Sequence, residues 1–334
     1  AIVPFQPPLA DLYDASRLAA AGLLSTTSQV VGLIVGVRVL VGLLAASAAT
    51  GRLLAIVLAA ASMFVGSALA FKETRLKRML AYLVVSNAGF GLIGLAVGFA
   101  DVASPEQSLV VSQSLPGGVS SVLFHAVTFI VSAGGLTAVI VYLSRAGEEI
   151  EHIEDLAGIG SREPPAAICA GICLLSLAGI PPFPGFWGRL FLIASSLSVH
   201  LESQRGFLPH PNPAFLLLGL VAAGSMVMAS AAWLRILATI FFNGQVARPQ
   251  PAGGQPALAA AILATTLLVG AGLLPGPLVG YIDGIVTAPA AVMTGAKNVG
   301  RSNRSTAPES GKARDVENGT GTPAPSAPAA DRQP

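Results

Sequence analysis

The chain has 334 residues, of which 53% are hydrophobic and 11% are charged, and its mean hydropathy is +0.71. Soluble domains carry about 25% charged residues, so this composition excludes a soluble globular protein and predicts an all-α polytopic membrane protein surrounded by lipids. The formal net charge of +2 gives no reason to expect nucleic acid or another strongly acidic partner.

Apolar runs long enough to cross a bilayer follow one another as far as residue 282. Crossing takes about 20 apolar residues. The runs that satisfy this rule are 19–46, 53–71, 79–100, 119–143, 166–199, 214–242 and 257–282. The segment 1–10 is apolar but interrupted by proline and too short to span. We therefore predict about seven transmembrane helices in one membrane domain, residues 1–282.

The composition changes after residue 282. Residues 283–334 become rich in Ser, Thr, Gly, Pro and Ala and lose the apolar periodicity. A segment of this kind cannot bury enough apolar surface to fold by itself. We expect an extramembrane tail that is disordered unless a partner holds it.

Positive charges are distributed unevenly over the connectors between these runs. One side of the membrane receives Arg17, Lys72, Arg75, Lys77, Arg78, Arg145, Arg162 and Arg248, and the other receives Arg52 and Arg205. By the positive-inside rule the first side is cytoplasmic, or faces the matrix in a mitochondrion. With seven spans, the tail then emerges on the periplasmic or intermembrane-space side.

The run 166–199 is interrupted in its middle. The helix-breaking residues are Gly179, Pro181, Pro182, Pro184, Gly185 and Gly188. Each proline removes a backbone donor, and in lipid the freed groups must find partners inside the protein, so the break predicts a polar cavity. Arg189 follows the break, and an intramembrane charge is a candidate functional residue. The alternative is a kinked helix whose arginine reaches the membrane surface.

Cys169 and Cys173 are the two cysteines of the chain, four residues apart on one predicted helix. With no histidine nearby they make a poor metal site, so we expect buried structural thiols and no metal. The sequence has no glycine-rich nucleotide loop, no cysteine array for an iron–sulfur cluster and no haem motif. We therefore expect the chain to hold no cofactor and to perform no redox chemistry itself.

Three segments, taken together, resemble the antiporter-like subunits of respiratory complex I (NADH:ubiquinone oxidoreductase). Leu-Ser-Leu-Ala-Gly-Ile-Pro-Pro-Phe-Pro-Gly-Phe-Trp-Gly-Arg at 175–189 is similar to the broken twelfth helix of that family. Glu-Thr-Arg-Leu-Lys-Arg-Met-Leu-Ala-Tyr at 73–82 is similar to the entry to its tenth helix. Val-Pro-Phe-Gln at 3–6, followed by Asp-Leu-Tyr-Asp at 11–14, resembles the segment before its eighth helix. The motif Asp-Leu-Tyr at 11–13 is typical of the subunit N branch of this family, called subunit 2 in mitochondria.

This resemblance implies a fold of about fourteen helices built from inverted repeats, of which the chain would be the C-terminal portion, the eighth to fourteenth helices. It implies as partners other membrane-arm subunits, including a chain that supplies the missing N-terminal helices. The FMN, iron–sulfur clusters and ubiquinone of such a complex would lie outside this chain. The implied location is the mitochondrial inner membrane, with the bacterial plasma membrane as the alternative.

The resemblance also implies a proton path, and this chain departs from it. Gln29 and Arg189 stand where the family has lysines, and Asn87 stands where it often has histidine. Glutamine cannot carry a proton as a charged relay, and arginine does not release one. His125 is a candidate relay because histidine titrates near neutral pH, the alternative being a satisfied core residue. Lys77 could line the cytoplasmic half-channel or simply anchor the topology.

We therefore expect a non-redox membrane-arm subunit that contributes to proton translocation coupled to quinone reduction. Two alternatives stay open. One is a subunit of a multi-subunit sodium–proton antiporter. The other is a structural subunit with a degenerate proton path, which the residues at positions 29 and 189 favour.

Overall fold

The computed structural model describes residues 2–17, 20, 22–24, 26–29, 31–32, 35, 48–103, 118–144, 150–201, 210–244 and 254–284. The chain separates into a unit Ala1–Ala288 and a second unit Pro289–Pro334. The described residues all belong to the first unit. The predicted tail, residues 283–334, lies outside them apart from its first two residues.

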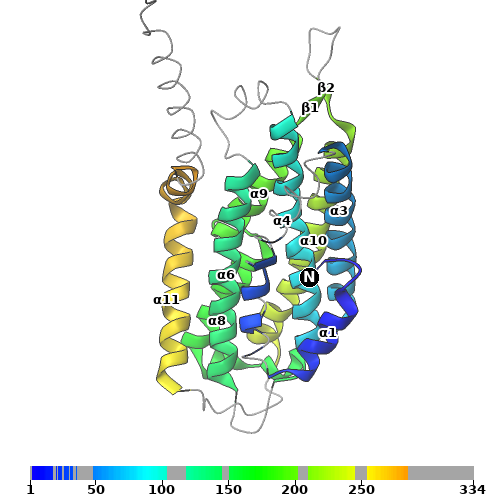
Figure 1. Cartoon of the computed structure of the whole chain (residues 1–334). Helices are drawn as coiled ribbons and strands as arrows, with labels where there is room; N and C mark the ends of the chain where they lie inside the picture. Colours follow the sequence, from blue (N-terminus) through cyan, green and yellow to red (C-terminus); the bar gives the residue numbers. More distant parts are fainter. Residues whose placement is uncertain are drawn as a thin grey trace, which may run out of the picture. The chain divides into compact units, whose positions relative to one another are not determined.

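Helices make up almost all of the described structure (Figure 1). They are α1 (Gln6–Ala15), α3 (Ala48–Lys72), α4 (Leu76–Ala103), α6 (Gly118–Leu143), α7 (Ile159–Arg162), α8 (Pro164–Ala178), α9 (Pro184–Leu197), α10 (Pro213–Phe242) and α11 (Gly254–Leu273), with a 3-10 helix η1 (Ile153–Leu156). Two short strands, β1 (His200–Leu201) and β2 (His210–Pro211), pair antiparallel with His200 opposite Pro211. The predicted all-α fold is confirmed.

In the described part of the chain five helices are long and apolar enough to cross a membrane. They are Thr50–Lys72, Leu76–Gly98, Gly118–Leu143, Pro213–Phe242 and Gly254–Leu273. They confirm five of the seven predicted spans. The predicted span 166–199 is present as α8 and α9, of 15 and 14 residues, with a break between them. Most of the predicted span 19–46 lies outside the described residues.

Helices α3 and α4 form an antiparallel pair on one side of the bundle, and α11 lies at the other side beside α6 and α8 (Figure 1). Glycine permits the close approach of α3 to α4. A Cβ on Gly66 would lie 2.6 Å from the backbone nitrogen of Ser86, and one on Gly89 would lie 2.6 Å from Cγ of Met63. Small residues at helix contacts are typical of membrane bundles, where close packing replaces the hydrophobic effect.

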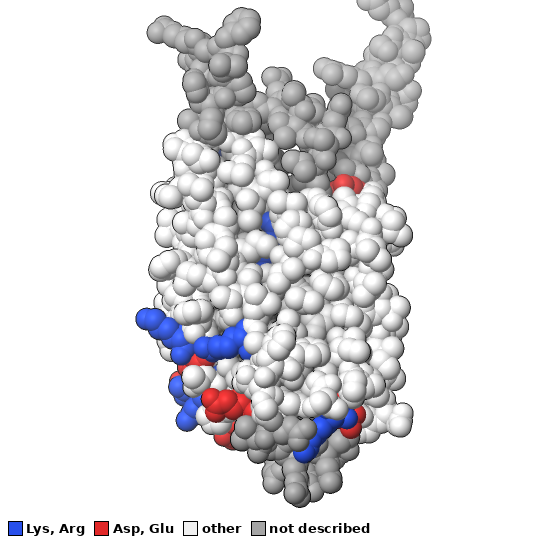
Figure 2. Space-filling view, turned by 180° about the vertical axis from the view of Figure 1, so that it is seen from behind, with Lys and Arg blue, Asp and Glu red and all other residues white. Residues whose placement is uncertain are grey.

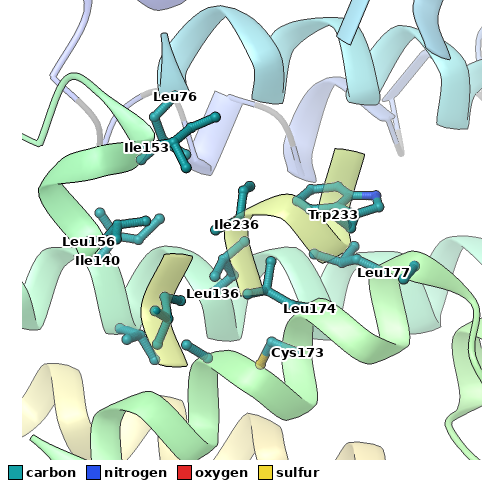
Figure 3. Close-up of a cluster of buried hydrophobic side chains, with 14 of the residues drawn as sticks. Leu76, Leu136, Ile140, Ile153, Leu156, Cys173, Leu174, Leu177, Trp233 and Ile236 are labelled. Atoms are coloured by element: carbon teal, nitrogen blue, oxygen red, sulfur yellow. The ribbon is translucent and has the colours of Figure 1, made fainter. Parts of the chain in front are cut away.

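A buried apolar cluster joins α4, α6, α8, α10 and η1. Figure 3 shows ten labelled members, Leu76, Leu136, Ile140, Ile153, Leu156, Cys173, Leu174, Leu177, Trp233 and Ile236. Cys169 and Cys173 are both buried and free, in agreement with their predicted structural role.

An arginine from α10 holds the turn between α3 and α4. Arg235 donates through Nη1 to the carbonyl oxygen of Phe71 at 3.1 Å and through Nη2 to that of Glu73. The last carbonyls of a helix have no partner within the helix. Arg235 therefore caps α3 from across the bundle.

Charged side chains gather toward one end of the face shown in Figure 2. At the start of α4, Arg75 and Arg78 contact the Asp14 carboxylate at 3.0 and 3.1 Å. Nearby, Lys77 donates from Nζ to the carbonyl oxygen of Ser16 at 2.9 Å. These contacts attach α1 to α4, although partly exposed ion pairs contribute little stability. The buried ring of Tyr13 supplies the apolar part of the same contact.

We predict that Gly66→Ala destabilises the protein, because the added methyl would meet the rigid backbone of α4 at Ser86 and Tyr82. Overpacking of this kind costs about 1–3 kcal/mol. The matched control is Gly134→Ala in α6, where an added Cβ meets nothing within 4 Å. Alanine there is expected to be neutral or to stabilise by up to about 1 kcal/mol. Thermal unfolding in detergent measures both, and an equal melting temperature for the two variants would contradict the prediction.

Candidate functional site

The break in the fifth predicted span begins where α8 ends. Gly179 has φ 74° and ψ 47°, the left-handed conformation that glycine adopts without strain. Its N–H donates to the carbonyl oxygen of Ser176 at 3.0 Å, and that of Ile180 donates to Leu175 at 3.1 Å. This pattern is a helix C-cap of the Schellman type. Helix α9 then begins at Pro184, since a proline in the first turn loses no intrahelical bond.

Arg189, in the second turn of α9, folds back onto the end of α8. Its side chain is buried, with 4% exposed. Nη1 donates to the carbonyl oxygen of Ala178 and Nη2 to that of Leu177, at 2.8 and 2.5 Å. Ser230 Oγ of α10 lies 2.6 Å from the Ala178 oxygen and 2.6 Å from that of Met226, so its one proton can go to either. The guanidinium therefore satisfies free carbonyls at the negative end of the α8 dipole. The alternative expectation, that this arginine reaches the membrane surface, is wrong.

In the described part of the chain no carboxylate lies within 4 Å of the Arg189 guanidinium. The guanidinium carbon instead lies 5.3 Å from the centroid of the Phe90 ring, a cation–π contact from α4. A buried cation without a counter-ion requires hydrogen-bond acceptors and polar surroundings. The carbonyls of the broken helix supply the acceptors.

A small cavity adjoins the guanidinium and supplies the polar surroundings. It is lined by Asn87, His125, Thr128, Phe129, Ser132, Ser176, Leu177, Gly185 and Arg189. The space open to the centre of a water molecule is about 10 Å³, which is about enough for one water. A cavity therefore lies at the break, and both polar and apolar side chains line it.

His125 on α6 reaches this cavity next to α9. A Cβ on Gly188 would lie 3.1 Å from Cα of His125, so glycine permits this contact between the helices. The imidazole is 4% exposed, and its centroid lies 6.1 Å from that of Phe90. Neither ring nitrogen makes a hydrogen bond of good geometry within the described residues, although the Asn87 backbone is close enough to interact.

The structure does not bring Gln29 or Lys77 into this cavity. Gln29 lies in a helical stretch, 26–29, and donates from Nε2 to the carbonyl oxygen of Val84 at 2.8 Å, about one turn from Asn87. Lys77 is buried near the start of α4, ten residues from Asn87, which is about 15 Å along the helix. Arg189 and His125 thus share one site, whereas Gln29 lies beside it and Lys77 lies far along α4.

The hydroxyl groups of the cavity were not among the residues predicted from the sequence. Ser132 Oγ of α6 and Ser176 Oγ of α8 are 2.8 Å apart. A signal was available in α6, where the buried residues Ser121, His125, Thr128 and Ser132 recur at spacings of four, three and four. This spacing places polar groups on one face of an otherwise apolar helix.

Residues 1–204 match the model of a protein family described as "NADH:quinone oxidoreductase/Mrp antiporter, TM". Among curated relatives, NADH-quinone oxidoreductase subunit N of Herminiimonas arsenicoxydans is 28% identical over 276 residues, covering 83% of this chain and 51% of that protein. NADH-quinone oxidoreductase subunit N 2 of Roseiflexus castenholzii is 31% identical over 287 residues, covering 86% and 53%. The chain thus spans about half the length of the relatives it matches.

Solved structures show the same fold. A chain of the Mrp complex from Dietzia sp. superposes with a TM-score of 0.66 at 19% identity, covering 86% of this chain and 56% of that one. A chain of respiratory complex I from Thermus thermophilus superposes with a TM-score of 0.64 at 21% identity, covering 84% and 55%. These neighbours confirm the antiporter-like fold. Since the family match covers residues 1–204 of 334, the chain belongs to the NADH:quinone oxidoreductase/Mrp antiporter transmembrane family.

Proposed function

We propose that the chain is a non-redox subunit of the membrane arm of an NADH:quinone oxidoreductase and contributes to proton translocation coupled to quinone reduction. The relatives named as subunit N support this assignment. The observation that carries it is the buried cation Arg189 at a helix break, beside a cavity that His125 lines. Ionisable residues at membrane depth mark ion pathways in transporters.

In this proposal the residues in and beside the cavity have different roles. Arg189 stays charged, since arginine effectively does not release its proton, and it acts as a fixed positive charge that orients polar groups. His125 is the cavity residue whose ring nitrogens can accept and release a proton, which the neighbouring arginine does not do. Gln29 donates its amide to a backbone carbonyl and serves as a contact between helices. The FMN, iron–sulfur clusters and quinone would be held by other subunits of the complex.

The partners in this proposal are other membrane-arm subunits and the helices that make up the remaining length of the relatives, on the same chain or on another. Lipid would cover part of the outer surface. Leu263, Leu267 and Leu273 on α11 are each more than half exposed. The relatives from Herminiimonas and Roseiflexus are bacterial and favour the plasma membrane over the mitochondrial inner membrane.

Two other functions have specific support. The superposition on the Mrp chain from Dietzia favours a sodium–proton antiporter subunit, whose activity would depend on sodium. The absence of a carboxylate beside Arg189 in the described residues, together with glutamine at position 29, favours a structural subunit. The number of protons translocated per NADH oxidised, measured in reconstituted vesicles, distinguishes the three functions.

We predict that Arg189→Ala lowers the amount of assembled complex or its turnover, because the Leu177 and Ala178 oxygens lose their guanidinium partner. Each unpaired buried group costs about 1–3 kcal/mol. Arg189→Lys keeps a cation within reach of these oxygens and is expected to preserve assembly. The complex with glutamine at position 29 is expected to be active, so activity should not require the substitution Gln29→Lys. Protons translocated per NADH oxidised by the reconstituted complex are the measurement. The structural-subunit function would be ruled out if the native complex and Arg189→Lys translocate the full number of protons, while Arg189→Ala assembles but translocates none.

We predict that His125→Gln slows proton translocation by about ten-fold or more, since the amide cannot titrate. The matched control is His152→Gln, which makes the same change at an exposed position near the start of α4. Proton release in reconstituted vesicles should be normal in this control. Equal rates for both variants would show that His125 carries no protons.

The orientation can be tested at the two ends of the span Thr50–Lys72. Lys72→Cys should react with a membrane-impermeant maleimide from the cytoplasmic side, and Thr50→Cys from the opposite side. Both positions are exposed, and the native thiols Cys169 and Cys173 are buried. Labelling of inverted and right-side-out vesicles is the measurement. The reverse pattern would overturn the orientation and the predicted side of the tail.

A further inference from the structure

The positive charge of Arg189 is only partly offset by the groups that contact it. The side chain is 4% exposed, so the charge is buried. The end of α8, which it contacts through the Leu177 and Ala178 carbonyls, carries about half a negative charge. The face of the Phe90 ring attracts a cation but has no net charge. No carboxylate of the described residues lies within 4 Å of the guanidinium. A buried charge without a partner is costly, so a negative group is expected beside Arg189.

The guanidinium has hydrogen-bond donors left for such a group. It has five N–H groups and makes two bonds to carbonyls, so three N–H groups remain. The cavity that Arg189 lines, between α4, α6, α8 and α9, is the space in which these donors can find an acceptor. A group that neutralises the arginine from this cavity must carry negative charge and accept hydrogen bonds.

Asn87 and His125 can add donors in the same cavity. Both are at least nine-tenths buried, and Oδ1 of Asn87 and both ring nitrogens of His125 have no hydrogen-bond partner within the described residues. An amide has two N–H donors, and a neutral imidazole has one. The neighbouring groups determine which end of the amide points into a cavity and which ring nitrogen carries the proton. A negative acceptor beside Arg189 would therefore turn the N–H groups of both side chains toward itself.

The serine pair can supply a further donor. Ser132 Oγ lies 2.7 Å from the carbonyl oxygen of Thr128 and 2.8 Å from Ser176 Oγ. A hydroxyl has one proton, so when Ser132 donates to Ser176, the Ser176 proton can be donated into the cavity. A Cβ on Gly185 would fall on the carbonyl oxygen of Ser176, so glycine lets the start of α9 approach this serine closely. Side chains from four helices can thus direct donors into one small space.

The size of the cavity limits which anion can bind. The space open to the centre of a water molecule is about 10 Å³, about enough for one water. Sulfate, phosphate and organic acids are too large for it. Chloride is a single atom only slightly larger than a water molecule. A water would satisfy hydrogen bonds here but would leave the net charge of the arginine unchanged.

We propose that this cavity binds one chloride ion as the counter-ion of Arg189. The ion accepts hydrogen bonds from the guanidinium, from the Asn87 amide and from the Ser176 hydroxyl. It neutralises the charge that the end of α8 leaves uncompensated, so the break between α8 and α9 becomes stable inside the membrane. The complex then needs chloride for stability. This site does not depend on the proposed function, because binding and stability are measured without turnover.

The test uses the whole complex, purified with sulfate in place of chloride, to which chloride is added at constant ionic strength. The number of radioactive chloride ions bound per complex is the first measurement, and the melting temperature is the second. Asn87→Asp keeps the shape of the side chain and supplies a fixed negative charge in the cavity. The matched control is Asn243→Asp, the same change at the exposed end of α10. Ser176→Ala removes one donor and leaves the charge unchanged.

We expect the native complex and the Asn243→Asp control to bind one chloride more than Asn87→Asp does. Chloride should raise the melting temperature of the native complex and of the control, and should leave that of Asn87→Asp unchanged. Ser176→Ala should weaken chloride binding by about ten-fold, because a hydrogen bond to a charged group is lost. If Asn87→Asp does not assemble, the affinity of Ser176→Ala decides.

Equal chloride binding by the native complex and Asn87→Asp, or an unchanged affinity in Ser176→Ala, would overturn the proposal. A high-resolution map in which a water or a carboxylate from another helix occupies the cavity would also overturn it. Normal proton translocation by a native complex that binds no chloride in this cavity would remove the chloride site and leave the proposed function intact.

Discussion

The structure depends on the bonds from the Arg189 guanidinium to the last carbonyls of α8. A helix that ends inside a membrane leaves carbonyls that lipid cannot satisfy, at a cost of several kcal/mol each. Here every carbonyl of the last turn has a partner. Leu175 and Ser176 accept from the backbone of Ile180 and Gly179, and Leu177 and Ala178 accept from Arg189. The break and the buried charge therefore stabilise each other.

Arginine suits this position for a geometric reason. Its planar guanidinium reaches two carbonyls at once, whereas the lysine implied by the family resemblance is a point charge that can be deprotonated when it is buried. Arg235 caps the end of α3 in the same way, by bonding the carbonyls of Phe71 and Glu73. Arg189 therefore binds two carbonyls and, unlike the lysine that the resemblance implies, keeps its proton.

Composition and local patterns were sufficient to predict the membrane class, five of the spans and the break. Apolar runs of sufficient length must be helical in lipid because a helix satisfies its own backbone. Glycine and proline end a helix through their own φ angles, as Gly179 and Pro184 do here, so their effect needs no tertiary context. The polar face of α6 from Ser121 to Ser132 could also have been recognised from its spacing, although each serine alone is unremarkable.

The sequence by itself determined that a charge follows a helix break at membrane depth, because hydrophobicity and backbone sterics are local properties. Only the tertiary structure decided what that charge contacts. The carbonyls that Arg189 caps, the carbonyl of Val84 that Gln29 contacts, and the bond between Ser132 and Ser176, 44 residues apart, all depend on how neighbouring helices rotate and pack. Rotation and packing arise from the summed contacts of whole helix faces, and no single motif records them.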